Sequence, residues 1–263
     1  MPHILTDILN KKFAEVRERK ALCPQNRLET ICADLPATRS LRAALENSET
    51  GIIAEFKRRS PSKGWIRQDA AVEDIIPAYV TNGASAHSIL TDNSFFGGTL
   101  ADIETARPLT PLPILRKEFI VDSYQLYEAR AAKADAVLLI AAALTPTACR
   151  ALAAEARSIG LEVLLEIHNE GELDHYSDDV SLIGVNNRNL GSFRTDPEVS
   201  LRLADRLPSD VLHISESGLR SPDVLRTLRE AGYRGFLIGE AFMCRENPGE
   251  ALAAYIKNLQ TCM

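Results

Sequence analysis

Eight short apolar runs recur along the chain, and each is followed by a longer stretch that mixes apolar and polar residues. The runs are continuous rather than alternating, which is typical of parallel strands that are buried on both faces. Their starts lie roughly 20 to 35 residues apart, as expected for strand–helix units joined by short loops. The runs cover residues 51–56, 86–91, 113–117, 136–140, 162–167, 182–186, 211–216 and 235–239.

Cap and turn residues indicate helices between these runs. Thr145 followed by Pro146 predicts a helix over residues 147–158, and Gly160 lies where that helix would end. The sequence Asp-Ser-Tyr-Gln at 122–125 resembles a capping box ahead of a helix over residues 126–133. Similar signals predict further helices over residues 198–206 and 223–230.

Eight strand–helix units in series predict an α/β fold, the (β/α)8 TIM barrel. The alternative is an open doubly wound sheet, but no G-x-G-x-x-G motif follows any of the apolar runs. No low-complexity tract or linker divides the chain. We therefore expect a single barrel domain over residues 47–263.

The sequence before the barrel predicts helices of its own. Apolar residues recur near helical spacing at Ile4, Ile8, Leu9, Phe13 and Val16. A second short helix is predicted over residues 40–45. Residues 1–46 are thus expected to form an N-terminal helical extension packed on the barrel. Two positions are compatible with the sequence, one on the surface of the barrel and one as a lid over one of its ends.

Composition and charge exclude several classes of protein. The formal net charge of −6 argues against a general nucleic-acid binder. No run reaches the ~18 apolar residues of a membrane helix, and the N-terminus lacks the apolar segment of a signal peptide. The scattered cysteines contain no C-x-x-C pair and fit a reducing cytoplasm; they are Cys23, Cys32, Cys149, Cys244 and Cys262.

Polar and charged residues gather at the C-terminal ends of the apolar runs, where a (β/α)8 barrel carries its active site. Residues i and i+2 of a strand share a face, so Glu55 and Lys57 point the same way. Two carboxylates beside two amines keep one another ionised and can transfer protons at neutral pH. The alternative is a set of rim salt bridges, which recurrence on several strands disfavours. The residues in question are Glu55, Lys57, Lys117, Glu166, Asn186, Arg188 and Glu216.

The last two runs carry the signal of a phosphate site. Gly218 and Gly239 allow backbone N–H groups to approach a ligand closely, and Ser217 adds a hydroxyl. The loops after strands seven and eight are the usual phosphate site of this architecture. A single glycine in such a loop is most simply explained as a turn residue. Two glycines, one in each of these two loops, favour an anion site.

The histidines and the tryptophan are less informative. No pair of histidines has the spacing of metal ligands, so we expect no metal. His87 and His213 lie inside apolar runs as core residues, whereas His168 shares a strand face with Glu166 and is a candidate for its support. Trp65 either packs within the first loop or stacks on an aromatic substrate.

Several short motifs resemble those of the indole-3-glycerol-phosphate synthase family. The two most specific are IIAEFKRRSPSKG at residues 52–64 and PILRKEFI at residues 113–120. The resemblance extends over nearly the whole chain, the N-terminal extension included. Further matching motifs are residues 89–92, 96–98, 165–168, 184–190, 215–218 and 237–240.

The resemblance implies a lyase of tryptophan biosynthesis that needs no cofactor. Its substrate is 1-(2-carboxyphenylamino)-1-deoxyribulose 5-phosphate, which undergoes ring closure, decarboxylation and dehydration to indole-3-glycerol phosphate, CO2 and water. Lys117 matches the general acid of ring closure, while Glu166 and Lys57 match residues that assist proton transfer. Glu55 matches a residue that orients the lysines, and Asn186 lies with this catalytic set.

The resemblance also implies how the substrate is held. Substrate contacts are expected from Ser60, Phe119, Leu138, Arg188, Glu216 and Leu237, with Phe119, Leu138 and Leu237 as apolar walls. The phosphate is expected at Lys57, Ser217, Gly218, Gly239 and the backbone N–H of Glu240. A departure from the family pattern is His87, where an apolar residue is expected.

Two other functions remain open at the level of sequence. A sugar-phosphate isomerase would use the same phosphate loops without a wall for an aromatic ring. A non-catalytic barrel would use the charged residues for stability or for binding a partner. The expected partner is a phosphorylated small molecule, with no nucleic acid and no membrane, and the chain is expected to be a monomer. The sequence leaves open an association with other enzymes of the pathway, and closure of the loop Arg58–Gly64 over the substrate.

Overall fold

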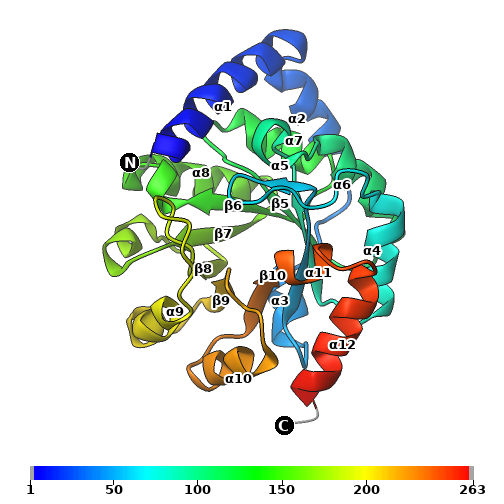
Figure 1. The fold of residues 1–263 in the computed structure, drawn as a ribbon. Helices are drawn as coiled ribbons and strands as arrows, with labels where there is room; N and C mark the ends of the chain where they lie inside the picture. The colour runs from blue at the N-terminus through cyan, green and yellow to red at the C-terminus, as the bar shows by residue number, and fades with distance from the viewer. Residues whose placement is uncertain (1–2, 261–263) are drawn as a thin grey trace.

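Eight parallel strands close into a barrel in the computed structural model, which describes residues 3–260 (Figure 1). Each predicted strand is present with its ends within one residue of the prediction, so the (β/α)8 barrel is confirmed. In chain order the strands are β1 (Ile52–Phe56), β4 (Ala86–Leu90), β5 (Ile114–Lys117), β6 (Ala136–Ile140), β7 (Glu162–Ile167), β8 (Leu182–Asn186), β9 (Leu212–Glu216) and β10 (Gly235–Ile238). The barrel closes between β1 and β10, where Ile52 pairs with Phe236.

Helices surround the barrel, as the ribbon in Figure 1 shows. The longer ones are α4 (Val72–Thr81), α6 (Leu100–Ala106), α7 (Tyr124–Ala131), α8 (Pro146–Ser158), α9 (Glu198–Leu203), α10 (Pro222–Glu230) and α12 (Pro248–Gln260). Short helices α5 (Asn93–Phe96) and α11 (Glu240–Met243) and 3-10 turns η1 (Arg107–Leu109), η2 (Ala141–Ala143), η3 (Glu170–His175) and η4 (Ala204–Arg206) complete the loops. A two-stranded hairpin of β2 (Arg59–Ser60) and β3 (Gly64–Trp65) lies in the first loop.

Helix caps follow the sequence signals in part. The Thr145 hydroxyl accepts the N–H of Ala148, and Gly160 takes a φ of +84° after the helix, both as predicted. The predicted capping box at residues 122–125 is present in a modified form. Gln125 Oε1 accepts the N–H of Asp122, as such a box requires, and also the N–H of Val121. Asp122 Oδ1 accepts the N–H of Tyr124 at 2.9 Å instead of that of Gln125.

The barrel interior shows why the charged residues meet at one end. Ile53, Leu115 and Leu164 belong to one buried apolar cluster inside the barrel. Because side chains alternate along a strand, the residues two positions later face the same interior. Those residues are Glu55, Lys117 and Glu166. The strands thus carry an apolar layer below and a polar layer at their C-terminal ends.

The opposite end of the barrel is closed by α3 (Leu41–Glu46), the short helix predicted over residues 40–45. Leu41 and Leu45 are buried in the interior cluster. The backbone N–H of Arg42 donates to Glu162, the first residue of β7. This helix therefore seals the end of the barrel that is away from the charged residues.

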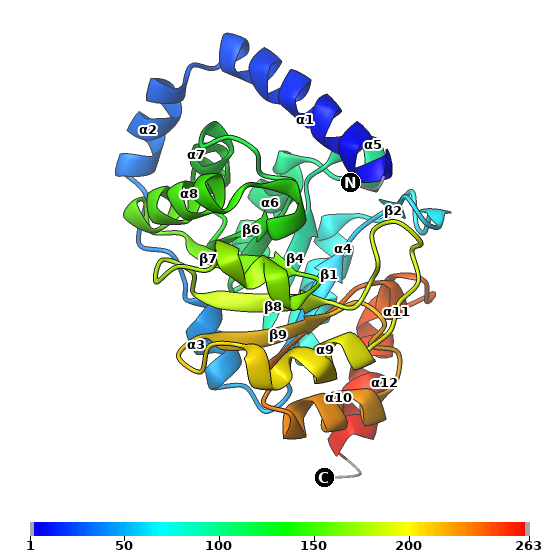
Figure 2. The same ribbon diagram turned by 90° about the vertical axis from the view of Figure 1, so that its left-hand side faces the viewer.

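The N-terminal extension reaches the other end. It consists of α1 (His3–Leu22), as predicted, and α2 (Gln25–Ala33), which the sequence did not reveal because Leu28 is its one buried residue. Figure 2 shows the two helices as an arch next to α7, with the first turns of α1 close to α5 and β2. Lys12 is buried beneath α1 and forms ion pairs with Asp92 and Glu118 beyond the ends of β4 and β5.

Other expectations concern single residues. His87 is fully buried, its Nε2 lies 3.0 Å from Thr110 Oγ1, and burial lowers its pKa to about 3, so it packs as a neutral core residue. Four cysteines are free thiols, and Cys262 lies outside the described residues. Within residues 3–260, no helix combines the length and the apolar character that crossing a membrane requires.

Candidate active site

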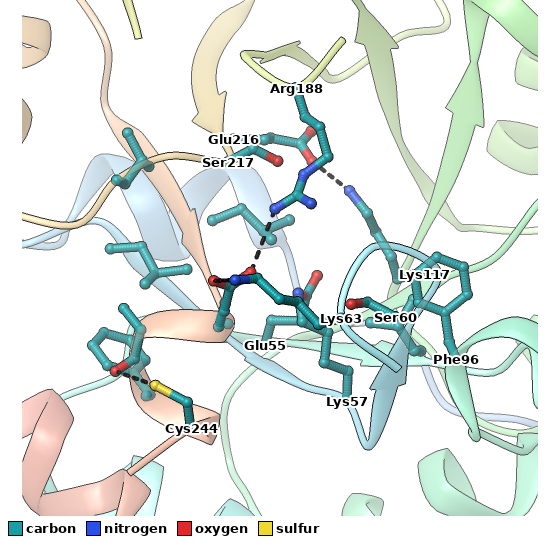
Figure 3. A pocket seen from close by; sticks show the side chains of 18 of the residues that line it. Glu55, Lys57, Ser60, Lys63, Phe96, Lys117, Arg188, Glu216, Ser217 and Cys244 are labelled. Atoms are coloured by element: carbon teal, nitrogen blue, oxygen red, sulfur yellow. Dashed lines mark hydrogen bonds and ion pairs between the residues drawn. The ribbon is translucent and has the colours of Figure 1, made fainter. Parts of the chain in front are cut away.

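The C-terminal ends of the strands open into a cavity of about 1420 Å³ (Figure 3). All predicted site residues line it, from loops and strands that are far apart in sequence. They are Glu55, Lys57, Ser60, Lys117, Phe119, Leu138, Glu166, Asn186, Arg188, Glu216, Ser217, Gly218, Leu237, Gly239 and Glu240. Typical ligand pockets enclose about 300–1,000 Å³, so a phosphorylated aromatic compound has ample room.

Lys117 lies at the centre of the charged layer. Its Nζ is 3.1 Å from Glu166 Oε2 and also donates a short hydrogen bond to Glu216 Oε2, which Figure 3 shows. Burial lowers the pKa of Lys117, but Glu216, Glu166 and Glu55 raise it by more, so the net shift is upward. Lys117 is therefore a charged, oriented proton donor inside the cavity.

The two carboxylates that hold Lys117 differ in their pKa. Burial raises the pKa of Glu166, but Lys117 and His168 lower it by more, and the net shift is downward. Burial also raises the pKa of Glu216. Attraction to Lys117 lowers this pKa and repulsion from Glu166 raises it, and the net result is a pKa of about 7. Two carboxylates with pKa values moved apart can divide base and acid roles between them.

Glu55 and Lys57 form the second pair. Lys57 Nζ donates to Glu55 Oε1 at 2.5 Å, and both side chains face the interior from the end of β1. Gly239 lies directly against Glu55, where any side chain at position 239 would collide with the carboxylate. The glycine is thus required by close packing as well as by any approach of a ligand.

The phosphate region is shaped by backbone conformation. Ser217 and Gly218 both have positive φ, at +66° and +76°, a backbone conformation that is uncommon for a residue other than glycine such as Ser217. Asn187 fixes this turn, since its Nδ2 donates to Ser217 O at 3.1 Å and to Ser215 Oγ at 3.0 Å. Asn187 is a supporting residue that our sequence reasoning missed, although it lies beside Asn186 at a strand end.

The apolar wall is larger than predicted. Phe96 joins Phe119, with ring centroids 6.1 Å apart, and Leu138 and Leu237 lie across the cavity. Ile4, Leu5 and Ile8 of α1 also line it. The first turns of α1 therefore line the mouth, while Val16 and Leu28 pack with Tyr124 of α7, so the extension combines the two positions that the sequence allowed. Helical spacing alone does not reveal which surface a helix covers.

The first loop approaches the cavity from the side. Ser60 Oγ is buried without a hydrogen-bond partner among the described residues, as expected of a group that awaits a ligand. Arg188 Nη1 donates to Ser62 Oγ at 2.8 Å, which ties the loop to the end of β8. Trp65 is 50% exposed, lies under Arg59 and is outside the cavity lining. Its packing within the loop is the interpretation that the structure supports.

His168 supports Glu166 from behind. Its Nε2 lies 3.6 Å from Glu166 Oε1 and its Nδ1 3.4 Å from Glu172 Oε2. Burial lowers the pKa of His168, but Glu172 and Glu166 raise it by more. Among residues 3–260, no group of three or more His, Cys, Asp and Glu side chains is arranged to hold a metal ion.

Fold and site together define a (β/α)8-barrel enzyme with paired lysines and carboxylates at the C-terminal ends of its strands. Comparison with known proteins gives the family. The family model described as indole-3-glycerol phosphate synthase matches residues 5–255. The chain belongs to the indole-3-glycerol phosphate synthase family.

Proteins that carry that name are similar to this chain over almost their whole length. The indole-3-glycerol phosphate synthase of Bacteroides thetaiotaomicron is 54% identical over 260 residues, which cover 99% of this chain and 100% of that protein. Those of Burkholderia vietnamiensis and Burkholderia lata are each 42% identical over 257 residues, which cover 95% of this chain and 98% of each protein.

Proposed function

We propose that the chain converts 1-(2-carboxyphenylamino)-1-deoxyribulose 5-phosphate to indole-3-glycerol phosphate, CO2 and water. The observation that carries the proposal is Lys117, held between the buried carboxylates of Glu166 and Glu216 in a cavity with an aromatic wall. Family membership supports the same reaction. The sugar-phosphate isomerase alternative is not favoured, because such an enzyme has no use for this wall.

Ring closure requires an acid at the ketone of the ribulose chain. The ring carbon that bears the carboxylate attacks the carbonyl carbon, and a carbon–carbon bond forms as the carbonyl oxygen takes a proton. Lys117 Nζ–H is the donor we assign, because its two carboxylate partners keep it charged and oriented. General acids of this kind contribute roughly 10²–10⁴-fold to a rate.

Decarboxylation and dehydration complete the reaction. The bond to the carboxylate breaks, CO2 leaves, and its electron pair restores the aromatic ring. The new hydroxyl then leaves as water after protonation, while a proton is removed from the carbon next to nitrogen. We assign these transfers to Lys57 and Glu166, with Glu55 orienting Lys57 at 2.5 Å. One proton is consumed overall when the substrate carboxylate is ionised.

Binding groups are proposed around these four. The phosphate would meet Lys57, Ser217, Gly218, Gly239 and the Glu240 N–H. Arg188 is assigned to the anthranilate carboxylate, with Asn186, Ser60 and Glu216 as further polar contacts. Phe119, Leu138 and Leu237 would pack on the ring. The buried, unpartnered oxygens of Ser60 and Glu216 support their contact with a ligand.

We also propose that the chain acts as a cytoplasmic monomer. The free cysteines support a reducing compartment. Light scattering at micromolar concentration would check the monomer.

Indole fluorescence tests the function directly. The purified chain is mixed with the substrate in the presence of chelator, and fluorescence is followed. We expect turnover in wild type, a loss of at least about 10²-fold in Lys117→Ala, and no change in Lys11→Ala on the exposed side of α1. Circular dichroism checks that Lys117→Ala is folded. Rapid turnover by Lys117→Ala would contradict the assignment of Lys117 as the general acid. If the protein binds ribulose phosphate as tightly as the full substrate, an isomerase is favoured.

A further inference from the structure

Glu240 poses an electrostatic problem for the proposed phosphate site. Its backbone N–H is an expected phosphate donor, yet the same residue carries a carboxylate, which repels phosphate. The side chain is about one-quarter exposed and lies in the wall of the cavity. Something must therefore neutralise this carboxylate for the site to accept an anion.

Three cations from three different loops surround the Glu240 carboxylate. Arg188 Nη2, from the loop after β8, lies 3.5 Å from Glu240 Oε2. Arg220 Nη2, from the loop after β9, lies 3.7 Å from Oε1, and Lys63 Nζ, from the hairpin turn, lies 4.0 Å from it. Figure 3 shows Arg188 and Lys63 both reaching into the mouth.

We propose that the Glu240 carboxylate is an internal anion that holds these cations until a phosphorylated ligand arrives, and thereby lowers the affinity of the empty site for phosphate. This inference rests on the proposed function, because it needs the phosphate beside Glu240. Mutual repulsion of the two anions acts in the same direction. As the product leaves, the carboxylate regains its cations, which favours release.

The other contacts of Arg188 agree with this role. Its Nη1 donates to Ser62 Oγ at 2.8 Å while Nη2 faces Glu240, so both ends of the guanidinium are engaged by the protein itself. A ligand anion that takes Arg188 must break at least one of these contacts. Glu240 is therefore a residue that sets ligand affinity, and chemistry at Lys117 does not depend on it directly.

Calorimetric titration with inorganic phosphate tests the proposal. Glu240→Gln keeps the shape of the side chain and removes its charge. We expect the Kd for phosphate to fall about fivefold, the equivalent of one partly exposed ion pair. Glu240→Ala should also bind phosphate more tightly than wild type. The advantage should shrink at high ionic strength, since salt screens exposed charges.

Glu230→Gln is the matched control. Glu230 is exposed at the end of α10, outside the cavity lining, so its loss changes the net charge equally without touching the mouth. Its Kd for phosphate should equal that of wild type. An unchanged or weaker affinity in Glu240→Gln overturns the proposal, whether or not the enzyme turns over. If wild type lacks synthase activity while Glu240→Gln binds phosphate more tightly than wild type, the proposed reaction is overturned and the role of Glu240 stands.

Discussion

Lys12 joins α1 to the barrel through carboxylates that have almost no solvent contact. Its Nζ lies 2.8 Å from Asp92 Oδ2 and 3.1 Å from Glu118 Oε1. Asp92 follows β4, and Glu118 follows Lys117 directly in sequence. Burial lowers the pKa of Lys12, but Glu118 and Asp92 raise it by more, so Lys12 is charged at neutral pH. Lys12→Met keeps most of the side-chain volume and removes this charge.

Removal of one partner from a buried ion pair costs about 3–5 kcal/mol, because the remaining charge stays buried without compensation. Some compensation persists in this case. Asp92 Oδ1 accepts the N–H of Phe95 at 2.7 Å, and Glu118 Oε1 accepts the N–H of Phe119 at 2.8 Å. We therefore expect the lower end of the range, a loss of about 3 kcal/mol in the free energy of unfolding at pH 7.

Urea unfolding followed by circular dichroism measures this loss. Lys11→Met is the control, because Lys11 is the exposed neighbour on the same helix. Because the pKa of Lys12 is raised above 10.5, the stability that its charge supplies is present below that pH and is lost as the pH rises beyond it, so the deficit of Lys12→Met should shrink above pH 10.5. The KM for the substrate should rise, because α1 contributes Ile4 and Ile8 to the cavity.

Two results would refute this reasoning. One is a free energy of unfolding for Lys12→Met within about 0.5 kcal/mol of the Lys11→Met value, the usual range of surface substitutions. The other is a deficit that stays constant as the pH rises beyond 10.5, which would mean that apolar packing, and not charge, is what Lys12 supplies.

Two further predictions concern single residues of the site. Burial, together with repulsion from Glu166 and Glu55, raises the pKa of Glu216 from 4.5 to about 7 against the attraction of Lys117. The folded protein therefore binds this proton more tightly than the unfolded chain does. The contribution of Glu216 to the free energy of unfolding should fall as the pH rises from 4.5 to about 7. Glu216→Gln should remove that fall, and urea titrations that remain parallel to wild type across this range would contradict it. Phe96→Ala should raise the KM for the full substrate about tenfold while the Kd for inorganic phosphate is unchanged, because the ring lines the aromatic end of the cavity; equal weakening of both would place Phe96 in general packing instead.

The barrel was predictable because its strands are buried on both faces. Such strands leave continuous apolar runs, and β6, β7 and β8 match their predicted bounds without change. The hairpin of β2 and β3 left no such trace, since each strand has two residues and Arg59, Ser60 and Gly64 are not apolar. Short elements that are held by the fold around them carry little pattern of their own.

The site residues that lie on strands were predictable from the strand pattern. Glu55, Lys117, Glu166 and Glu216 each occupy one of the last two positions of a strand, so one rule about barrel ends places them together. Phe96 and Asn187 were missed for different reasons. Phe96 lies on a four-residue helix without a strand register to place it. Asn187 contacts backbone and hydroxyl groups of the next strand, and the sequence does not reveal that a strand-end amide faces its neighbour.

The charge of the buried layer explains how the site can supply a proton. Three carboxylates, Glu55, Glu166 and Glu216, face two amines, Lys57 and Lys117, among the side chains described. Full ionisation would leave one excess negative charge in a partly desolvated cavity. Burial first, and then the repulsion from Glu166 and Glu55, raises the pKa of Glu216 to about 7 against the attraction of Lys117. Near neutral pH a proton is thus shared within the layer. The proposed reaction consumes one proton per turnover from an ionised substrate, so an acidic group with this pKa matches what the chemistry requires.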